Sequence, residues 1–137
     1  MGVAIYPVLE DGSAGWTNRI EGKSLARAVE VLDRRAKKCK ARTLFFFYSW
    51  SREEAIIEQL GGDPDDPSTF DESQILLGKW YDPTEGLVTV RVLLEYVRSC
   101  GDKIDHVRHV IEDLEEFERV LSRAAAGGVR WYLGLSE

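Results

Sequence analysis

The spacing of apolar residues predicts a long helix over residues 82–101. Apolar side chains recur there every three or four positions, at Leu87, Val90, Leu94 and Val97, with Val88, Leu93 and Tyr96 widening the stripe. Asp82 is a good N-cap, Pro83 suits the first helical position, and Glu85 follows at the capping-box position. Gly101 is a natural stop. We therefore expect this helix to organise the packing of the chain.

A second long helix is predicted to begin at Asp102 or Lys103 and to run through Ala126. Its apolar stripe consists of Val107, Val110, Ile111, Leu114, Phe117, Leu121 and Ala124. Gly127-Gly128 ends it. The first half of the chain predicts two shorter helices, residues 25–40 with Ser24 as the cap and residues 51–60 with Ser51 as the cap.

Strand-forming residues dominate at both ends of the chain, over residues 3–9 and 129–135. The apolar run 43–49 is read either as a buried strand or as a link between helices, because periodicity does not separate the two. These elements predict an α+β fold, with a small, mostly antiparallel sheet covered by two long helices and two shorter ones. We expect residues 1–137 to form a single globular domain.

Composition and charge narrow the class of protein. Of 137 residues, 44% are hydrophobic and 31% are charged, which is typical of a globular protein, and the net charge is −6. Residues 1–50 hold nine Lys/Arg against five Asp/Glu (+4), and residues 51–137 hold nine against nineteen (−10). An acidic surface argues against a nucleic-acid partner and favours a basic protein partner.

Two further features concern where the protein resides. The longest apolar run, Leu44 to Trp50, is far shorter than the roughly 20 residues of a membrane helix, so we expect no membrane association. The two cysteines, Cys39 and Cys100, are too few for a disulfide framework, and we expect two reduced thiols in a cytoplasmic protein.

Three stretches of the second half resemble an uncharacterised family of small soluble bacterial proteins. The matching residues are Trp80-Tyr81-Asp82-Pro83 with Glu85-Gly86-Leu87, Val90-Arg91 and Leu93-Leu94, then Glu112-Asp113-Leu114, and finally Ala124 to Leu133. The resemblance implies a bacterial cytoplasmic protein. It brings no activity, cofactor or catalytic residue to this chain.

The two histidines, His106 and His109, are the candidate metal ligands. They are three residues apart on the predicted second long helix, and the nearby carboxylates are Asp102, Asp105, Asp113 and Glu116. Imidazole and carboxylate groups on one helix face are able to hold a divalent ion such as zinc, but spacing fixes no third ligand. We expect no cofactor and favour a solvated, charged face, with a divalent metal as the alternative.

Aromatic residues give the second candidate site. Trp16, Trp50, Trp80 and Trp131 are many for this length, and Trp80-Tyr81 precedes a predicted helix N-terminus. Core packing explains such residues in most folds. The alternative is a ligand-binding or partner-binding surface formed by Trp50, Trp80, Tyr81 and Trp131.

The basic cluster at the end of the first helix has two readings. Cations in the last turns complement the helix dipole, which explains a solvated helix end without a ligand. Contact with phosphate is the alternative reading.

No catalytic motif stands out, so we expect a non-catalytic protein-binding module, such as an immunity or inhibitor protein directed at a basic partner. Two alternatives stay open. One is a small-ligand or metal-dependent enzyme that uses the His106/His109 face or a Trp80 notch, and the other is a structural homo-oligomer.

Overall fold

Residues 3–13 and 22–136 are described by a computed structural model, and the chain divides into two compact units. Unit 1 comprises Met1–Tyr48 and Trp80–Glu137, and unit 2 comprises Ser49–Lys79. This division does not test whether residues 1–137 form a single domain, which stays a prediction. Trp16 lies outside the described residues.

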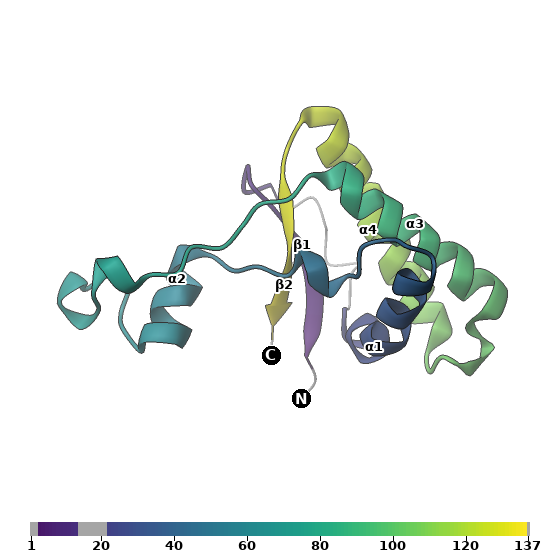
Figure 1. Cartoon of the computed structure of the whole chain (residues 1–137), viewed down its shortest axis with the longest axis horizontal. Helices are drawn as coiled ribbons and strands as arrows, with labels where there is room; N and C mark the ends of the chain where they lie inside the picture. The colour runs from purple at the N-terminus through teal and green to yellow at the C-terminus, as the bar shows by residue number, and fades with distance from the viewer. Residues whose placement is uncertain (1–2, 14–21, 137) are drawn as a thin grey trace. The chain divides into compact units, whose positions relative to one another are not determined.

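The two predicted terminal strands are present in unit 1 and pair with each other. Strand β1 (Ala4–Leu9) runs antiparallel to strand β2 (Trp131–Ser136). The register places Ala4 opposite Ser136 and Leu9 opposite Trp131. The two described ends of the chain therefore lie side by side, as Figure 1 shows.

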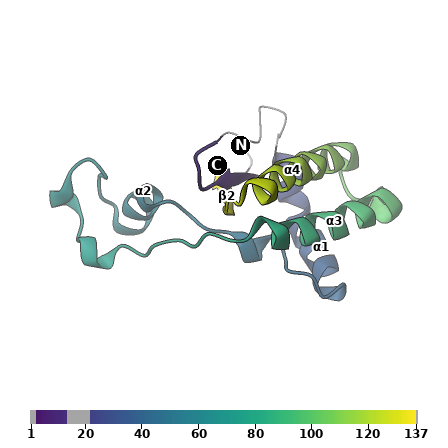
Figure 2. The same cartoon turned by 90° about the horizontal axis from the view of Figure 1, so that it is seen from above.

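Three helices accompany this sheet: α1 (Lys23–Lys38), α3 (Pro83–Cys100) and α4 (Val107–Gly127). Helices α3 and α4 lie side by side in both views and are joined by the 3-10 helix η5 (Gly101–Lys103) (Figures 1 and 2). Helix α1 packs against both of them. A small antiparallel sheet packed with helices confirms the predicted α+β fold class.

Helix α3 begins as its sequence predicts. The Asp82 carboxylate accepts a hydrogen bond of 2.8 Å from the backbone N–H of Thr84, and Pro83 occupies the first turn. The stripe side chains Leu87, Val90, Leu94 and Val97 are buried, whereas Val88 is 54% exposed. Val88 therefore does not belong to the core face, contrary to the prediction.

The starts of the other two long helices differ from prediction. Helix α1 is capped by Gly22, which has a left-handed φ of 75° and carries no side chain, so Ser24 is not the cap. Helix α4 begins at Val107, after His106, which has a left-handed φ of 55°. Asp102 and Lys103 belong to the 3-10 helix η5 instead, because left-handed backbone at His106 interrupts the helical path.

The run 43–49 is not a full strand and lies between two helices, in agreement with the second of its two readings. It forms the 3-10 helix η1 (Phe45–Phe47), followed by a bridge from Tyr48 to Leu133 of β2. Asp33 of α1 starts this turn, because its carboxylate accepts hydrogen bonds from the N–H groups of Leu44 (2.7 Å) and Phe45 (3.3 Å). Partial burial raises the pKa of the Asp33 carboxyl, against the lowering effect of these bonds.

Unit 2 is built from short helices and turns. Helix α2 (Arg52–Glu54) continues as the π-helix η2 (Ala55–Gln59), and the 3-10 helices η3 (Pro67–Thr69) and η4 (Glu72–Gln74) follow. The predicted start at Ser51 is confirmed as a full capping box, in which Ser51 and Glu54 exchange side-chain and backbone hydrogen bonds. Only Ser49, Ala55 and Ile56 of this unit are buried.

Candidate functional site

Trp131 belongs to the core of unit 1. Its side chain is 0% exposed and packs against Phe47, with ring centroids 5.0 Å apart. Gly86 of α3 lies against the indole so closely that a Cβ at this position would fall 2.5 Å from Trp131 Cζ2. The expectation that Trp131 lines a binding surface is therefore wrong, because this position of β2 faces the helices.

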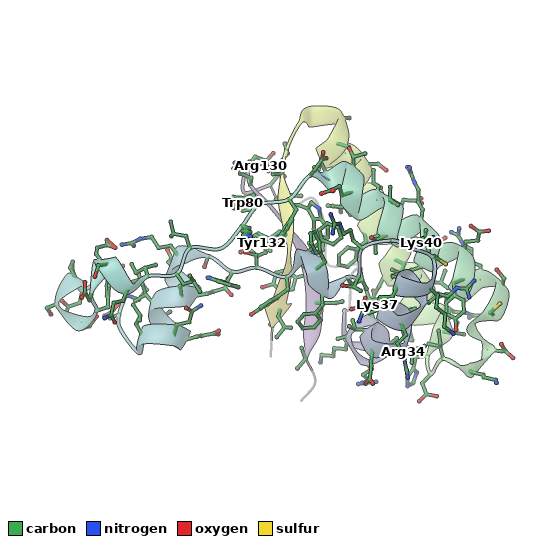
Figure 3. The ribbon with its side chains drawn as sticks, viewed as in Figure 1. Arg34, Lys37, Lys40, Trp80, Arg130 and Tyr132 are labelled. Carbon is green, nitrogen blue, oxygen red and sulfur yellow. The ribbon has the colours of Figure 1, made fainter. Side chains whose placement is uncertain are left out.

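Trp80 and Tyr81 are half-buried where the chain re-enters unit 1. The Trp80 ring lies 4.9 Å from the ring of Tyr132, and Figure 3 shows the two side by side. Tyr81 exchanges two backbone hydrogen bonds with Trp131, of 2.8 and 3.0 Å, and its ring packs against Phe46 and Phe47. Both aromatic residues thus have packing roles, and Trp80 and Tyr81 stay candidates for binding by prediction only.

Trp50 lies in unit 2 and is half-buried there. Its indole Nε1 donates a hydrogen bond of 2.8 Å to the backbone carbonyl of Leu76. This bond ties the first residues of unit 2 to the extended segment that closes it. Trp50 therefore has a structural role within unit 2, and its assignment to a binding surface stays a prediction.

The two histidines are close together but do not share one helix face. His106 is the residue before α4, and its ring centroid lies 6.2 Å from that of His109. Within residues 3–13 and 22–136, no group of three or more His, Cys, Asp or Glu side chains is placed to hold a metal ion. The metal assignment of His106 and His109 stays a prediction.

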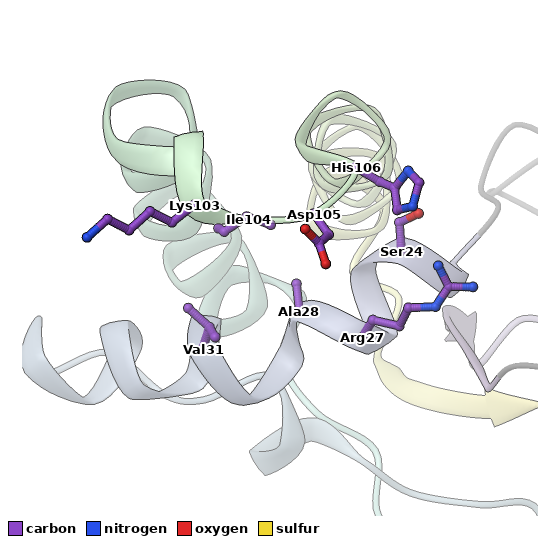
Figure 4. Close-up of a pocket in the computed structure, with 8 residues that line it drawn as sticks. All are labelled: Ser24, Arg27, Ala28, Val31, Lys103, Ile104, Asp105 and His106. Atoms are coloured by element: carbon purple, nitrogen blue, oxygen red, sulfur yellow. The ribbon is translucent and has the colours of Figure 1, made fainter.

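His106 instead lines a hollow of about 240 Å³ between α1 and the connection from α3 to α4. The lining side chains, drawn in Figure 4, are Ser24, Arg27, Ala28, Val31, Lys103, Ile104, Asp105 and His106. Two cations and one carboxylate are among them, and Ala28, Val31 and Ile104 make the surface partly apolar.

A second hollow, of about 260 Å³, continues along α1. It is lined by Val31, Arg34, Arg35, Lys38 and Tyr96, and Val31 is common to both hollows. The guanidinium of Arg35 lies 4.9 Å from the centre of the Tyr96 ring, which holds that cation at the edge of the hollow. We name the two hollows together the α1 groove.

Three cations of the α1 groove, Arg34, Arg35 and Lys38, belong to a strongly basic stretch of the chain. Residues 34–42 hold six Lys/Arg and no Asp/Glu, and Figure 3 labels three of them, Arg34, Lys37 and Lys40. None of the six takes part in an ion pair within the described part of the chain. The ion pairs of α3 and α4, such as Arg98–Glu115 at 2.8 Å, involve other residues.

Unit 2 carries the opposite charge. Its 31 residues include eight Asp/Glu and two Lys/Arg, a net charge of −6, whereas unit 1 holds sixteen of each kind and is neutral. Hydrogen bonds from Ser68 and Ser73 lower the pKa of Asp66 and Asp71, so both carboxylates remain ionised over a wider pH range. The whole net charge of the protein therefore resides in unit 2.

Unit 2 also exposes large apolar side chains. Ile57 is 54% exposed, Leu76 is 60% exposed and Leu77 is 68% exposed. Ile57 lies between the exposed carboxylates of Glu53 and Glu58 on the same short helix. We name the exposed carboxylates of unit 2 together with Ile57, Leu76 and Leu77 the acidic face. This combination suits a protein partner that is basic and partly apolar.

Sequence reasoning missed Ile57, Leu76 and Leu77, and it read the cations at the end of α1 as a solvated helix end, with contact to phosphate as the alternative. The signals present in the sequence are the adjacent leucines within a polar segment and the eight acidic residues of Ser49–Lys79.

Comparison with protein-family models, with curated proteins and with solved structures gave no match for this chain. The resemblance of residues 80–133 to a bacterial family therefore stays a prediction. None of the helices in the described ranges has the length and the apolar content that crossing a membrane requires.

Proposed function

We propose that this protein is a protein-binding module in which unit 2 is the contact surface and unit 1 is the scaffold. The observation that carries the proposal is the acidic face: one unit of 31 residues exposes three large apolar side chains and most of its eight carboxylates. Protein interfaces combine apolar side chains with polar and charged ones. The partner is a basic protein, because unit 2 carries the entire net charge of −6.

The charge distribution supports recognition of a basic partner rather than mere solubility. In unit 2 the described ion pairs amount to Arg52–Glu72, which leaves most of the carboxylates available to a partner. Charges of one sign gathered on one surface speed the association with an oppositely charged protein and make it sensitive to salt. An inhibitor or immunity protein that covers a basic active protein is a role of this kind.

The proposed setting is a reducing compartment such as the cytoplasm. Cys39 and Cys100 are both free and exposed, and exposed thiols persist where disulfide formation is suppressed.

The test is capture of a partner from a lysate of the organism that encodes the protein. The immobilised chain is compared with a variant of the acidic face, Ile57→Ser/Leu76→Ser/Leu77→Ser. The matched control is Val88→Ser, which makes the same kind of change at a side chain of α3 that is 54% exposed. Each capture is made at about 50 mM and about 500 mM NaCl, because salt screens exposed charges.

We expect the wild type and the Val88→Ser control to retain the same basic protein at low salt and to release it at high salt. Loss of interface anchors costs about 2 kcal/mol or more, so the acidic-face variant is expected to bind at least about thirtyfold more weakly. Retention that is equal for all three chains, or no specific protein at low salt, would count against the proposal.

A further inference from the structure

The α1 groove is a second surface with defined chemistry. Its two hollows of about 240 and 260 Å³ meet at Val31, so together they follow α1 from Ser24 to Lys38. Five cations line the groove, against one carboxylate: Arg27, Arg34, Arg35, Lys38 and Lys103 against Asp105. The groove is therefore suited to a negatively charged occupant.

The surface between these cations is partly apolar. Val31 is 38% exposed, and Ala28 and Ile104 lie beside it on either wall (Figure 4). A chain of phosphate groups has no apolar part, so these apolar side chains would not strengthen its binding. An acidic protein segment that also carries an apolar side chain would bury Val31 and pair with the cations.

The protein itself contains a segment of this kind. In unit 2, the short helix that starts at Ser51 exposes Ile57 between Glu53 and Glu58, and the unit as a whole carries a charge of −6. Ile57 and Val31 are both β-branched apolar side chains. Carboxylates flank Ile57, and cations flank Val31 in the groove. The two surfaces are complementary in charge and in the place of their apolar side chain.

We propose that the α1 groove of one molecule binds unit 2 of a second copy of this chain. This inference rests on the proposed function, since it names the basic α1 groove of a second copy as the surface that the acidic face binds. The contact joins two different surfaces, so two molecules that exchange unit 2 reciprocally close into a symmetric dimer.

The test uses charge reversal on either surface and sedimentation velocity over a range of protein concentrations. The groove variant is Arg34→Glu/Lys38→Glu, and the unit 2 variant is Glu53→Lys/Glu58→Lys. The control is Arg108→Glu/Arg123→Glu, which reverses two exposed cations of α4 outside the groove.

At about 50 mM NaCl, where exposed charges are weakly screened, we expect the wild type and the control to self-associate and both to become monomers at about 500 mM. Each of the other two variants places like charges opposite one another, and its self-association is expected to weaken by more than about tenfold. An equimolar mixture of the groove variant and the unit 2 variant restores opposite charges at both contacts. The mixture is therefore expected to associate although neither variant does so alone.

Two results would overturn the inference: a wild type that is monomeric at both salt concentrations, or a mixture that associates no more than its components. The groove variant and the control have the same net charge, so a difference in self-association between these two variants reports the groove contact and not net charge alone. If the mixture test fails while a basic lysate protein is still captured through Ile57, Leu76 and Leu77, the second copy is not the partner and the proposed function stands. If capture through these residues fails as well, both proposals fall.

Discussion

In unit 1 most of the large apolar side chains are buried, with Trp131, Phe47 and Phe117 all at 0% exposure, although Phe45 and Val88 are 51% and 54% exposed. In unit 2 the large apolar side chains Ile57, Leu76 and Leu77 are all more than half exposed. Unit 1 is neutral and crosslinks α3 to α4 with ion pairs, whereas unit 2 has a net charge of −6 and few cations to balance it.

The difference indicates that unit 1 holds most of the buried core and that unit 2 contributes mainly exposed surface. Stability resides where apolar side chains are buried, and local opening is easiest where few of them are. Unit 2 keeps its shape through a capping box, aspartate turns and the Trp50 hydrogen bond rather than through a core of its own. Side chains left out of a core are available for a partner.

The largest effect is expected from Trp131→Ala. Removing a buried tryptophan loses its packing against Phe47 and leaves a cavity, at a cost of about 3–5 kcal/mol in the free energy of unfolding. Urea unfolding followed by circular dichroism measures this loss. Trp50→Ala is the matched control, because Trp50 lies half-buried in unit 2; an equal loss for both variants would remove the distinction between the units.

A smaller loss is expected from Gly86→Ala. The new Cβ would lie 2.5 Å from Trp131 Cζ2, and the resulting overpacking outweighs the better helix propensity of alanine by about 1–2 kcal/mol. Gly127→Ala in α4 is the control, since its Cβ would meet only Val129 at 3.6 Å. Thermal unfolding of both variants distinguishes them, and a Gly86→Ala variant as stable as Gly127→Ala would show that the indole is free to move.

Asp33→Asn is expected to change how stability depends on pH. Burial raises the pKa of Asp33 in the folded state, so the folded protein binds this proton more tightly than the unfolded chain does. The proton therefore adds to the free energy of unfolding below the unfolded pKa, and this stabilisation is lost as pH rises through the folded pKa. Asparagine carries no charge at any pH. The stability of the wild type relative to Asp33→Asn should therefore fall as pH rises from about 3 to about 7.

Urea unfolding of the wild type and Asp33→Asn at several pH values in this range measures that difference. The effect should be smaller than that of Gly86→Ala, because the Asp33 side chain is only partly buried. A difference between the two chains that stays constant, or that grows in favour of the wild type, contradicts the assignment.

The smallest effect is expected from Arg91→Ala. Arg91 Nε lies 3.1 Å from Glu118 Oε2 at the surface between α3 and α4, and an exposed pair of this kind contributes about 0.2–1 kcal/mol. Arg123→Ala, on α4 and outside the described ion pairs, is the control. The difference in melting temperature between the two variants should vanish in high salt, and a difference that persists there would point to packing of the arginine stem.

Local signals in the sequence were sufficient for part of the fold. Asp82 and Pro83 specify the start of α3 through groups that are adjacent in the chain, and the structure has that start. The start of α4 was predicted too early, because apolar periodicity does not reveal the left-handed backbone of His106, which interrupts the helix. Whether the Trp131 side chain is buried likewise depends on which face of β2 meets the helices.

The candidate site was harder to predict than the fold. Periodicity identifies apolar side chains that could be buried, and it does not show whether another element covers them. Ile57 and Ile56 are neighbours of the same type, yet Ile56 is 0% exposed and Ile57 is 54% exposed. The acidic face and the α1 groove depend on which charged side chains the structure brings into the same unit, and the sequence alone does not show that.

The central claim is that unit 1 is a scaffold and unit 2 is its contact surface, and removal of unit 2 tests it most directly. Tyr48 and Tyr81 flank unit 2 and pair with Leu133 and Trp131, which are two residues apart on β2, so a short Gly/Ser linker can replace Ser49–Lys79. Capture from the lysate is then compared for the wild type and the shortened chain, after circular dichroism has shown that both are folded. We predict a folded unit 1 that no longer retains the basic partner; a shortened chain that retains the same protein as strongly as the wild type would contradict the claim.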